Sequence, residues 1–268
     1  MTDFWDQVLH FAETTANKVG KELMADFGQV QAVEKADGSL ITQSDKWADR
    51  ELCDAIANRF PEHGVLSEES AHIFPDTEWC WIIDPLDGTT NFARRIPIWG
   101  VSLGLLYRGV PVFGYVHLPP LHQSFHGFWS GTTGLKLPQG AFLDRRRIHS
   151  SSDPLDPNQF FSFCSRSIGN YQPDFPCKIR MLGVASYNFL TVAAGITLGG
   201  VEATPKIWDI AGVWPIIQAA GAVWHPLSPE PIFPLTPGTH YGDRSFPTLV
   251  TAQPDLLPVF EPFVQSLG

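Results

Sequence analysis

The chain has 268 residues, of which 44% are hydrophobic and 17% are charged. This balance excludes a mainly disordered chain, and the 23 Gly and 23 Pro follow no strict period, which excludes collagen-like and coiled-coil classes. With 18 Lys and Arg against 28 Asp and Glu, the formal charge is −10, so nucleic acid and anionic membranes are not expected partners.

The cysteines and the N-terminus indicate where the protein works. The four cysteines form no C-x-x-C pair and fit no zinc spacing, so we expect free thiols in a reducing compartment. Residues 1–10 lack the basic start of a signal peptide. The longest uncharged stretches contain Pro, His, Gly or polar residues rather than a clean apolar run of about 20 residues. We therefore expect a soluble, cytoplasmic protein.

The first half of the chain predicts two helices followed by a sheet. Apolar residues recur at helical spacing from residue 4 to 23, and a second helix fits residues 45–60, where Pro61 stops it. Short apolar runs at 64–67 and 79–84 predict strands. The next three strand-like runs are separated by turn residues and indicate an antiparallel meander over 98–107, 111–118 and 122–129.

The second half alternates between strands and helices after a boundary rich in Gly, Pro and Ser at 131–158. We expect a mixed α/β fold, with an N-terminal α+β lobe over 1–150 and a C-terminal α/β lobe over 151–268 in one compact unit. The predicted strands are 159–164, 201–203, 222–225 and 247–251, and the predicted helices are 185–197, 210–220 and 256–266.

The segment Trp81–Phe92 reads W-I-I-D-P-L-D-G-T-T-N-F and concentrates the chemistry. Two carboxylates, Asp84 and Asp87, stand three residues apart where an apolar strand runs into a predicted tight turn, and such a pair can bind one hard cation. Backbone amides and hydroxyls of Gly88, Thr89 and Thr90 can receive phosphate oxygens. Taken alone, D-P-x-D-G is about equally well explained as an ordinary polar turn.

Three other acidic segments have plain structural explanations when taken singly. Glu68 and Glu69 follow a strand and fit a solvated face. Asp45 and Asp209 each stand where a helix is expected to begin and fit a capping role.

Together, these segments resemble the inositol monophosphatase family of Mg²⁺-dependent, lithium-sensitive phosphatases. Its D-G-x-x-x-T-x-x-D, G-E-E-S, W-I-x-D-P-x-D-G-T-x-N-F and W-D-x-A elements appear here in order at 37–45, 67–70, 81–92 and 208–211. The resemblance spans the chain from the first helix to about residue 224. It implies a layered αβαβα sandwich, a homodimer and a small phosphorylated substrate.

The resemblance also implies a cluster of two to three Mg²⁺ ions. Glu68, Asp84 and the carbonyl oxygen of Leu86 would hold the first ion. Asp84, Asp87 and Asp209 would hold the second, and a weaker third ion would lie near Glu68. Oxygen ligands suit Mg²⁺, and clustered cations would explain how a chain of charge −10 binds a phosphate ester.

The catalytic roles implied by the family fall on Glu68, Thr89 and Asp45, with Thr89 hydrogen-bonded to Asp45 and orienting the attacking water. Gly88, Thr89 and Thr90 would hold the phosphate. The substrate's hydroxyls would meet positions listed here together: Asp87, Gly183, Ala185, Glu202 and Asp209.

Several positions depart from the family pattern. Ser67 replaces a Gly, Val184 replaces a hydroxyl-bearing residue, and Gln218 replaces a Glu. Pro215 lies inside the helix expected after Asp209 and is able to kink it. Residues 136–148 lack the family's G-A-x-x-N-G hairpin. These departures affect substrate identity and spare the proposed metal ligands.

The leading prediction is hydrolysis of myo-inositol 1-phosphate. Histidinol phosphate, a 3′-phosphoadenosine nucleotide and a fructose bisphosphate remain open as substrates, and a regulatory binding protein on the same fold is the alternative from another class. A zinc site at His117, His122 and His126 is disfavoured, because positions 122 and 126 would be widely separated on a strand.

Overall fold

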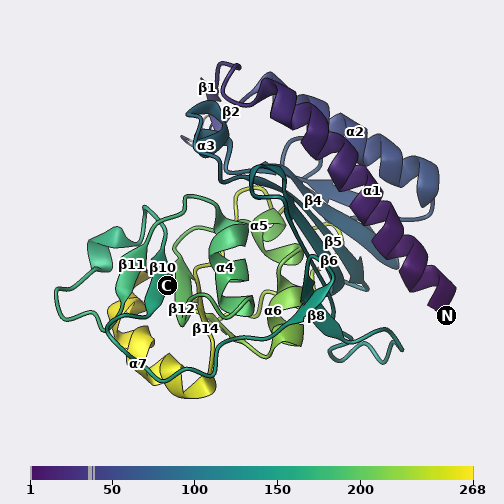
Figure 1. The fold of residues 1–268 in the computed structure, drawn as a ribbon. Helices are drawn as coiled ribbons and strands as arrows, with labels where there is room; N and C mark the ends of the chain where they lie inside the picture. The colour runs from purple at the N-terminus through teal and green to yellow at the C-terminus, as the bar shows by residue number, and fades with distance from the viewer. Residues whose placement is uncertain (1, 36–37, 39, 268) are drawn as a thin grey trace.

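Two sheets alternate with three layers of helices in the computed structural model, which describes residues 2–35, 38 and 40–267 (Figure 1). This arrangement confirms the expected α/β sandwich. Asp37, the first residue of the 37–45 motif, lies outside the described residues. The helices are α1 (Thr2–Asp26), α2 (Gln43–Arg59), α3 (Thr89–Ala93), α4 (Ala185–Ala193), α5 (Ile207–Ala211), α6 (Trp214–Ala220) and α7 (Leu257–Phe260).

The larger sheet has seven strands in the order β3-β4-β5-β6-β7-β8-β9. Only the β3–β4 pair is parallel, and the other pairs are antiparallel, so the expected meander is confirmed. Its strands are β3 (Gly64–Ser67), β4 (Trp79–Asp87), β5 (Gly100–Tyr107), β6 (Val110–Leu118), β7 (Gln123–Phe128), β8 (Gly140–Leu143) and β9 (Arg146–Ile148).

Alternation along the strands divides the core between the two faces of this sheet. In β4, Trp81 and Ile83 belong to the cluster packed on α1 and α2, whereas Cys80 and Ile82 belong to the cluster under α5 and α6. The first face is packed with aromatic rings: Trp5 of α1 meets Phe128 edge-on, with ring centroids 5.9 Å apart.

On the opposite face of this sheet, three neighbouring glycines lie beneath α5 and α6. Gly104, Gly114 and Gly127 are paired neighbours on β5, β6 and β7. A Cβ atom at Gly104 would stand 2.6 Å from the carbonyl carbon of Ala211, and one at Gly114 would overlap the carbonyl oxygen of Gly212. The helix backbone therefore rests directly on the sheet.

The smaller sheet has five strands in the order β11-β10-β12-β14-β13. Ser162 of β10 faces α4, with its hydroxyl 3.5 Å from that of Thr191, while Phe161 faces the outer side and packs on Phe260 of α7. Its strands are β10 (Phe160–Phe163), β11 (Lys178–Arg180), β12 (Gly199–Glu202), β13 (Val223–Pro226) and β14 (Thr248–Thr251), and a separate two-stranded pair joins β1 (Val33–Glu34) to β2 (Leu40–Ile41).

Three expectations about local structure were wrong. Residues 136–148 do form a hairpin, β8–β9, because Asp144 and Arg145 adopt the left-handed conformation that Asn-Gly supplies elsewhere. The single helix expected at 210–220 is two helices, and Pro215 lies in the first turn of α6 instead of kinking a continuous helix. The closing helix at 256–266 is broken into short turns around its prolines.

Other expectations are confirmed or stay open. The four cysteines are free thiols. No helix among the described residues is long and apolar enough to cross a membrane. The large sheet draws its strands from residues 64–148 and the small sheet from residues 160–251, while the division into lobes at residue 150 stays a prediction.

Candidate active site

Strand β4 delivers two carboxylates to the edge of the site. The tight turn expected after a strand at 79–84 begins later than predicted, because β4 continues through Pro85 to Asp87 with an irregularity in register between Asp84 and Asp87. The chain then turns at Gly88, whose φ of 94° favours glycine, and a Cβ there would stand 2.7 Å from Val184 Cγ2. The irregularity lets two residues three apart present their carboxylates to one site.

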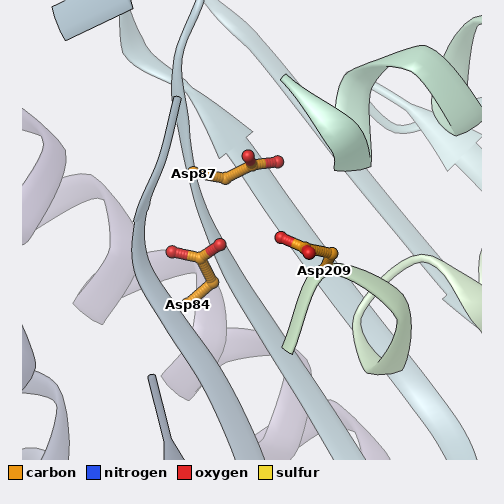
Figure 2. Close-up of side chains that lie close together, drawn as sticks. All are labelled: Asp84, Asp87 and Asp209. Carbon is orange, nitrogen blue, oxygen red and sulfur yellow. The ribbon is translucent and has the colours of Figure 1, made fainter. Parts of the chain in front are cut away.

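Asp84, Asp87 and Asp209 converge on one point, with one carboxylate oxygen of each within 4.8 Å of the others. Figure 2 shows the two β4 carboxylates and the carboxylate from α5 pointing toward one another. Asp84 and Asp87 are buried, with 1% and 7% of their surface exposed. Three acidic groups held this close fit a shared hard cation, because only a positive charge would offset their repulsion.

The pKa values of Asp84 and Asp209 show the same mutual repulsion between buried carboxylates. Burial first, and then the charges of Glu68, Asp87 and Asp209, raise the pKa of Asp84 well above its ordinary value. Burial and the Asp87 charge raise the pKa of Asp209 in the same way. A bound divalent cation would reverse both effects, so the donor set fits Mg²⁺.

Glu68 lies at the same cavity but outside this three-carboxylate cluster. Burial raises its pKa to about 7, even though the ammonium of Lys35 lies 3.0 Å from its Oε1. Lys35 also contacts Glu69 at 2.6 Å. The imidazole Nε2 of His72 lies 2.6 Å from the carbonyl oxygen of Glu68 and so ties this segment in place.

The turn between the acidic groups is internally hydrogen-bonded. The Leu86 N–H donates to Asp84 Oδ1 at 3.0 Å, and the carbonyl oxygen of Leu86 accepts the Thr89 hydroxyl at 3.1 Å. Both Leu86 and Thr90 line the cavity.

Thr89 and Asp45 are hydrogen-bonded, with Thr89 Oγ1 donating to Asp45 Oδ1 at 2.8 Å. The other carboxylate oxygen of Asp45 accepts the Thr42 N–H at 2.8 Å and completes the capping box of α2. Asp45 therefore both caps α2 and contacts Thr89 of the site. Burial raises its pKa despite these hydrogen bonds.

The cavity has a volume of about 310 Å³ and brings together segments from both halves of the chain. Gly183, Ala185 and Glu202 line it, as the family resemblance implies. The Ser186 N–H donates to Asp87 Oδ2 at 2.8 Å, and the Asn188 side-chain amide donates to the Glu202 carboxylate. Burial raises the pKa of Glu202 to about 7.

Some residues of the site were missed by sequence reasoning. Asn91 lies within the 81–92 motif, and its amide donates to the carbonyl oxygens of Ile98 and of Leu182, the residue before Gly183 of the cavity wall. Asn188, Arg166 and Lys206 line the cavity itself. Asn188 is one of few polar residues in an uncharged stretch and was an available signal, whereas nothing in the local sequence marks Arg166.

The histidines form no metal site in the part of the chain that the structure describes. His117 is buried with its Nδ1 2.9 Å from the Ser124 hydroxyl, and His126 stacks on Phe142.

The chain is similar in sequence and in fold to proteins of a known family. Residues 5–256 match the model of the inositol monophosphatase family. The chain is 32% identical over 230 residues to an inositol-1-monophosphatase of Synechocystis, covering 80% of this chain and 77% of that protein. It is 33% identical over 228 residues to a fructose-1,6-bisphosphatase/inositol-1-monophosphatase of Thermotoga maritima, covering 80% and 83%. A solved inositol monophosphatase structure from Thermotoga maritima superposes with a TM-score of 0.80 at 27% identity, covering 98% and 100%.

Proposed function

Because the chain belongs to the inositol monophosphatase family and is a phosphoric monoester hydrolase, we propose that it hydrolyses a sugar-alcohol monophosphate, foremost myo-inositol 1-phosphate, with the help of Mg²⁺. The observation that carries this proposal is the convergence of Asp84, Asp87 and Asp209 beside the hydrogen-bonded Thr89–Asp45 pair.

The carboxylates are proposed to hold two to three Mg²⁺ ions. Asp84 would be shared between a site completed by Glu68 and the Leu86 carbonyl and a site completed by Asp87 and Asp209. When bound, Mg²⁺ offsets the charge of the phosphate and makes water a better nucleophile.

Thr89 is proposed to orient the attacking water. Its one hydroxyl hydrogen lies between two acceptors, Asp45 Oδ1 at 2.8 Å from Oγ1 and the more distant Leu86 carbonyl oxygen at 3.1 Å, so its oxygen lone pairs are free to accept a hydrogen bond from water. Asp45 is held by Thr42 on its other oxygen and so keeps its direction. As the nucleophile forms, Thr89 Oγ1 can take a proton from the water while its own hydroxyl proton passes to Asp45 Oδ1.

The rest of the cavity is proposed to hold the ester. The backbone and hydroxyls of Gly88–Thr90 would receive the phosphate oxygens, and Asp87 and Asp209 would also meet the sugar. Glu202, oriented by Asn188, would accept a hydrogen bond from a hydroxyl of the leaving group, with Gly183 and Ala185 shaping the wall beside it. Val184 removes a hydroxyl from this wall and favours a less polar contact there.

The Thermotoga relative named above makes a fructose bisphosphate the second candidate substrate. Histidinol phosphate and a 3′-phosphoadenosine nucleotide remain alternatives within the family. A regulatory protein without activity would have no need to keep buried carboxylates in mutual repulsion, which favours catalysis. We also propose that the protein works as a cytoplasmic homodimer.

A panel assay of released phosphate tests the proposal. Inositol 1-phosphate, histidinol phosphate, adenosine 3′,5′-bisphosphate and fructose 1,6-bisphosphate are compared with Mg²⁺ and with EDTA. We expect Mg²⁺-dependent release, fastest from inositol 1-phosphate, and stronger inhibition by LiCl than by NaCl at submaximal Mg²⁺. Release that is indifferent to EDTA would overturn the metal assignment, and no release from any ester would favour the regulatory alternative.

A further inference from the structure

A second cavity lies between α1 and strands β6 to β8, on the face of the large sheet that is opposite α5 and α6. It has a volume of about 610 Å³, and none of its lining residues lines the catalytic cavity. Pockets that bind small molecules are of this order of size, have largely aromatic and apolar walls, and contain a few polar groups that orient the ligand. The composition of this cavity therefore bears on what it could bind.

The floor of the cavity is a row of three aromatic rings. Tyr115, His126 and Phe142 are directly paired neighbours on β6, β7 and β8, so their side chains stand side by side on one face of the sheet. His126 and Phe142 stack, with ring centroids 4.8 Å apart. Burial lowers the pKa of His126 to about 4, so this ring carries no charge at neutral pH. The floor therefore offers uncharged ring faces to a ligand.

The Tyr115 hydroxyl at this cavity is a buried polar group without a hydrogen bond. Tyr115 is only 2% exposed, and its hydroxyl has no partner among the described residues. The neighbouring Ser124 hydroxyl lies 2.9 Å from His117 Nδ1 instead. The charges of Glu13 and Asp144, which both line the cavity, act on the Tyr115 hydroxyl. A ligand bound at this end of the cavity would supply the missing partner.

The cavity carries more negative than positive charge. Arg145 is already paired, since its Nη2 lies 2.8 and 2.9 Å from the two carboxylate oxygens of Glu13. His10 of α1 is the other basic side chain on the wall. Asp6 and Asp144 also line the cavity, and neither is among the ion pairs of the described residues. These two carboxylates would attract a cation and repel an anion.

A plainer explanation is a crevice left where α1 ceases to cover the sheet. Two observations argue against it. A crevice does not require the Arg145–Glu13 ion pair, which joins residues 132 apart in sequence and ties the β8–β9 hairpin to α1 across the cavity. Packing alone would also favour phenylalanine over Tyr115, because a buried hydroxyl without a partner costs free energy.

We propose that this cavity binds a small organic ammonium ion that carries an aromatic or other apolar body. The body would lie on the rings of His126 and Phe142. The ammonium group would donate to the Tyr115 hydroxyl and the Asp144 carboxylate, and the ring faces would add to the attraction for its charge. Because the cavity is separate from the catalytic one, the proposal does not depend on the phosphatase activity.

The test compares three small molecules that share one body and differ in charge. 2-Phenylethylammonium, 2-phenylethanol and 3-phenylpropionate are titrated into the whole chain at pH 7, and binding is measured by isothermal titration calorimetry. Saturating Mg²⁺ and inorganic phosphate are present, so that the carboxylates of the catalytic cavity are not open to the ammonium group.

For the wild type we expect the ammonium ion to bind about two- to thirtyfold more tightly than the alcohol, the range for a cation held against aromatic rings. The carboxylate should bind most weakly, because Asp6 and Asp144 repel it. Equal affinities for the three molecules would show an apolar groove without selection for charge and would overturn the proposal. Failure of the ammonium ion to bind would overturn it as well.

Two conservative variants locate the binding. Tyr115→Phe removes only the hydroxyl, and Asp144→Asn removes the charge but keeps an acceptor for the Ser124 N–H, which Asp144 Oδ1 accepts at 2.9 Å. Both should fold, because the Tyr115 hydroxyl makes no hydrogen bond and asparagine tolerates the left-handed φ of 48° at position 144. Circular dichroism checks that they do. Tyr171→Phe and Asp54→Asn, at exposed positions outside the cavity, are the matched controls.

Tyr115→Phe should weaken binding of the ammonium ion about three- to tenfold, the range for one lost hydrogen bond. Asp144→Asn should weaken it by a similar factor and leave the affinity for 2-phenylethanol unchanged, since the alcohol carries no charge. The two control variants should bind like the wild type. An ammonium affinity that is the same in wild type, Tyr115→Phe and Asp144→Asn would place the binding elsewhere on the protein and overturn the proposal.

Discussion

On the α1–α2 face of the seven-stranded sheet the contacts are made by large aromatic side chains, whereas on the α5–α6 face helix backbone lies against glycine. Trp81 and Phe113 fill the first interface with rings. At the second, Gly114 has no room for even one methyl group beneath Gly212. Rings can adjust their packing by small rotations, but two backbones in contact cannot.

This difference matters because each face delivers a carboxylate to the same site. Asp209 comes on α5 from the glycine face, and Asp45 comes on α2 from the aromatic face. A metal ligand must be placed within a few tenths of an ångström, since carboxylate–Mg²⁺ bonds are about 2.0–2.1 Å long. The rigid glycine contact holds Asp209, which is proposed to bind metal, and the adaptable aromatic contact holds Asp45, which is proposed to act through its hydrogen bond to Thr89.

The largest effect is expected at Asp84, a proposed metal ligand that lies beside Asp209. Asp84→Asn should abolish measurable turnover, because the shared ligand of the proposed cations loses its charge. The metal-free variant should unfold at the same or a higher denaturant concentration than the wild type, since one buried repulsive charge is gone. Phosphate release and urea unfolding in EDTA measure the two effects. Asp76→Asn, at an exposed position, is the control, and turnover retained by Asp84→Asn would contradict the assignment.

A smaller loss is expected at the carboxylate from the aromatic face. Thr89→Ala and Asp45→Asn should each lower kcat about 10²–10⁴-fold with little change in KM, because the pair is proposed to act on water mainly in the transition state. The double variant should be barely worse than either single one, since each change breaks the same hydrogen bond. If Asp45 only caps α2, Asp45→Asn would instead cost about 0.5–2 kcal/mol of stability and keep kcat.

The two faces can be compared directly at adjacent positions on β6. Gly114→Ala should destabilise the fold by about 3 kcal/mol or more, because the added methyl group forces α5 and α6 off the sheet. It should also raise the Mg²⁺ concentration needed for half-maximal activity, since Asp209 moves with α5. Phe113→Leu, on the aromatic face, should cost about 1–2 kcal/mol and leave the Mg²⁺ requirement unchanged. Urea unfolding and Mg²⁺ titrations of both variants decide whether the glycine contact controls the metal site.

Sequence predicted the aromatic face better than the glycine face. The apolar spacing from residue 4 to 23 identified α1, and the punctuation at Arg108-Gly109 located the meander. The glycines of β5–β7 carried no signal in the sequence, because their role depends on contact with a helix about 100 residues away along the chain. The β8–β9 hairpin was missed for a similar reason, since Asp144 and Arg145 can adopt the left-handed conformation without the glycine that signals it.

Site residues that lie within a recognisable sequence motif were predicted, and those outside such a motif were not. The carboxylates of Trp81–Phe92 and the W-D element at 208 were placed together by family resemblance, and the structure brings their oxygens within 4.8 Å. The roles assigned to them remain predictions. Arg166 and Lys206 carried no local signal, because a single basic residue in a loop is common and only folding brings it to the cavity wall.

The smallest effect is a pH dependence on the aromatic face. His63 stacks between Phe60 and Trp79, and its Nδ1 accepts a hydrogen bond from Trp81 Nε1 at 3.1 Å. Burial lowers its pKa to about 4, so the folded protein keeps the ring neutral where the unfolded chain, with a pKa near 6.5, takes up a proton.

The unfolding free energy should therefore fall as pH decreases from about 6.5 to 4, with His63 contributing a slope of at most about 1.4 kcal/mol per pH unit. The buried carboxylates of the site act in the opposite direction, because their raised pKa values make the metal-free fold less stable as pH rises. The difference between wild type and His63→Gln at each pH removes their contribution, since both proteins keep the same carboxylates. Glutamine retains an acceptor for Trp81 and cannot titrate, so its advantage over the wild type should grow toward pH 4. A difference in unfolding free energy between wild type and His63→Gln that stays constant from pH 7 to pH 4 would contradict this prediction. It would show that His63 is protonated in the folded protein without cost and that the packing on the aromatic face accommodates a charge.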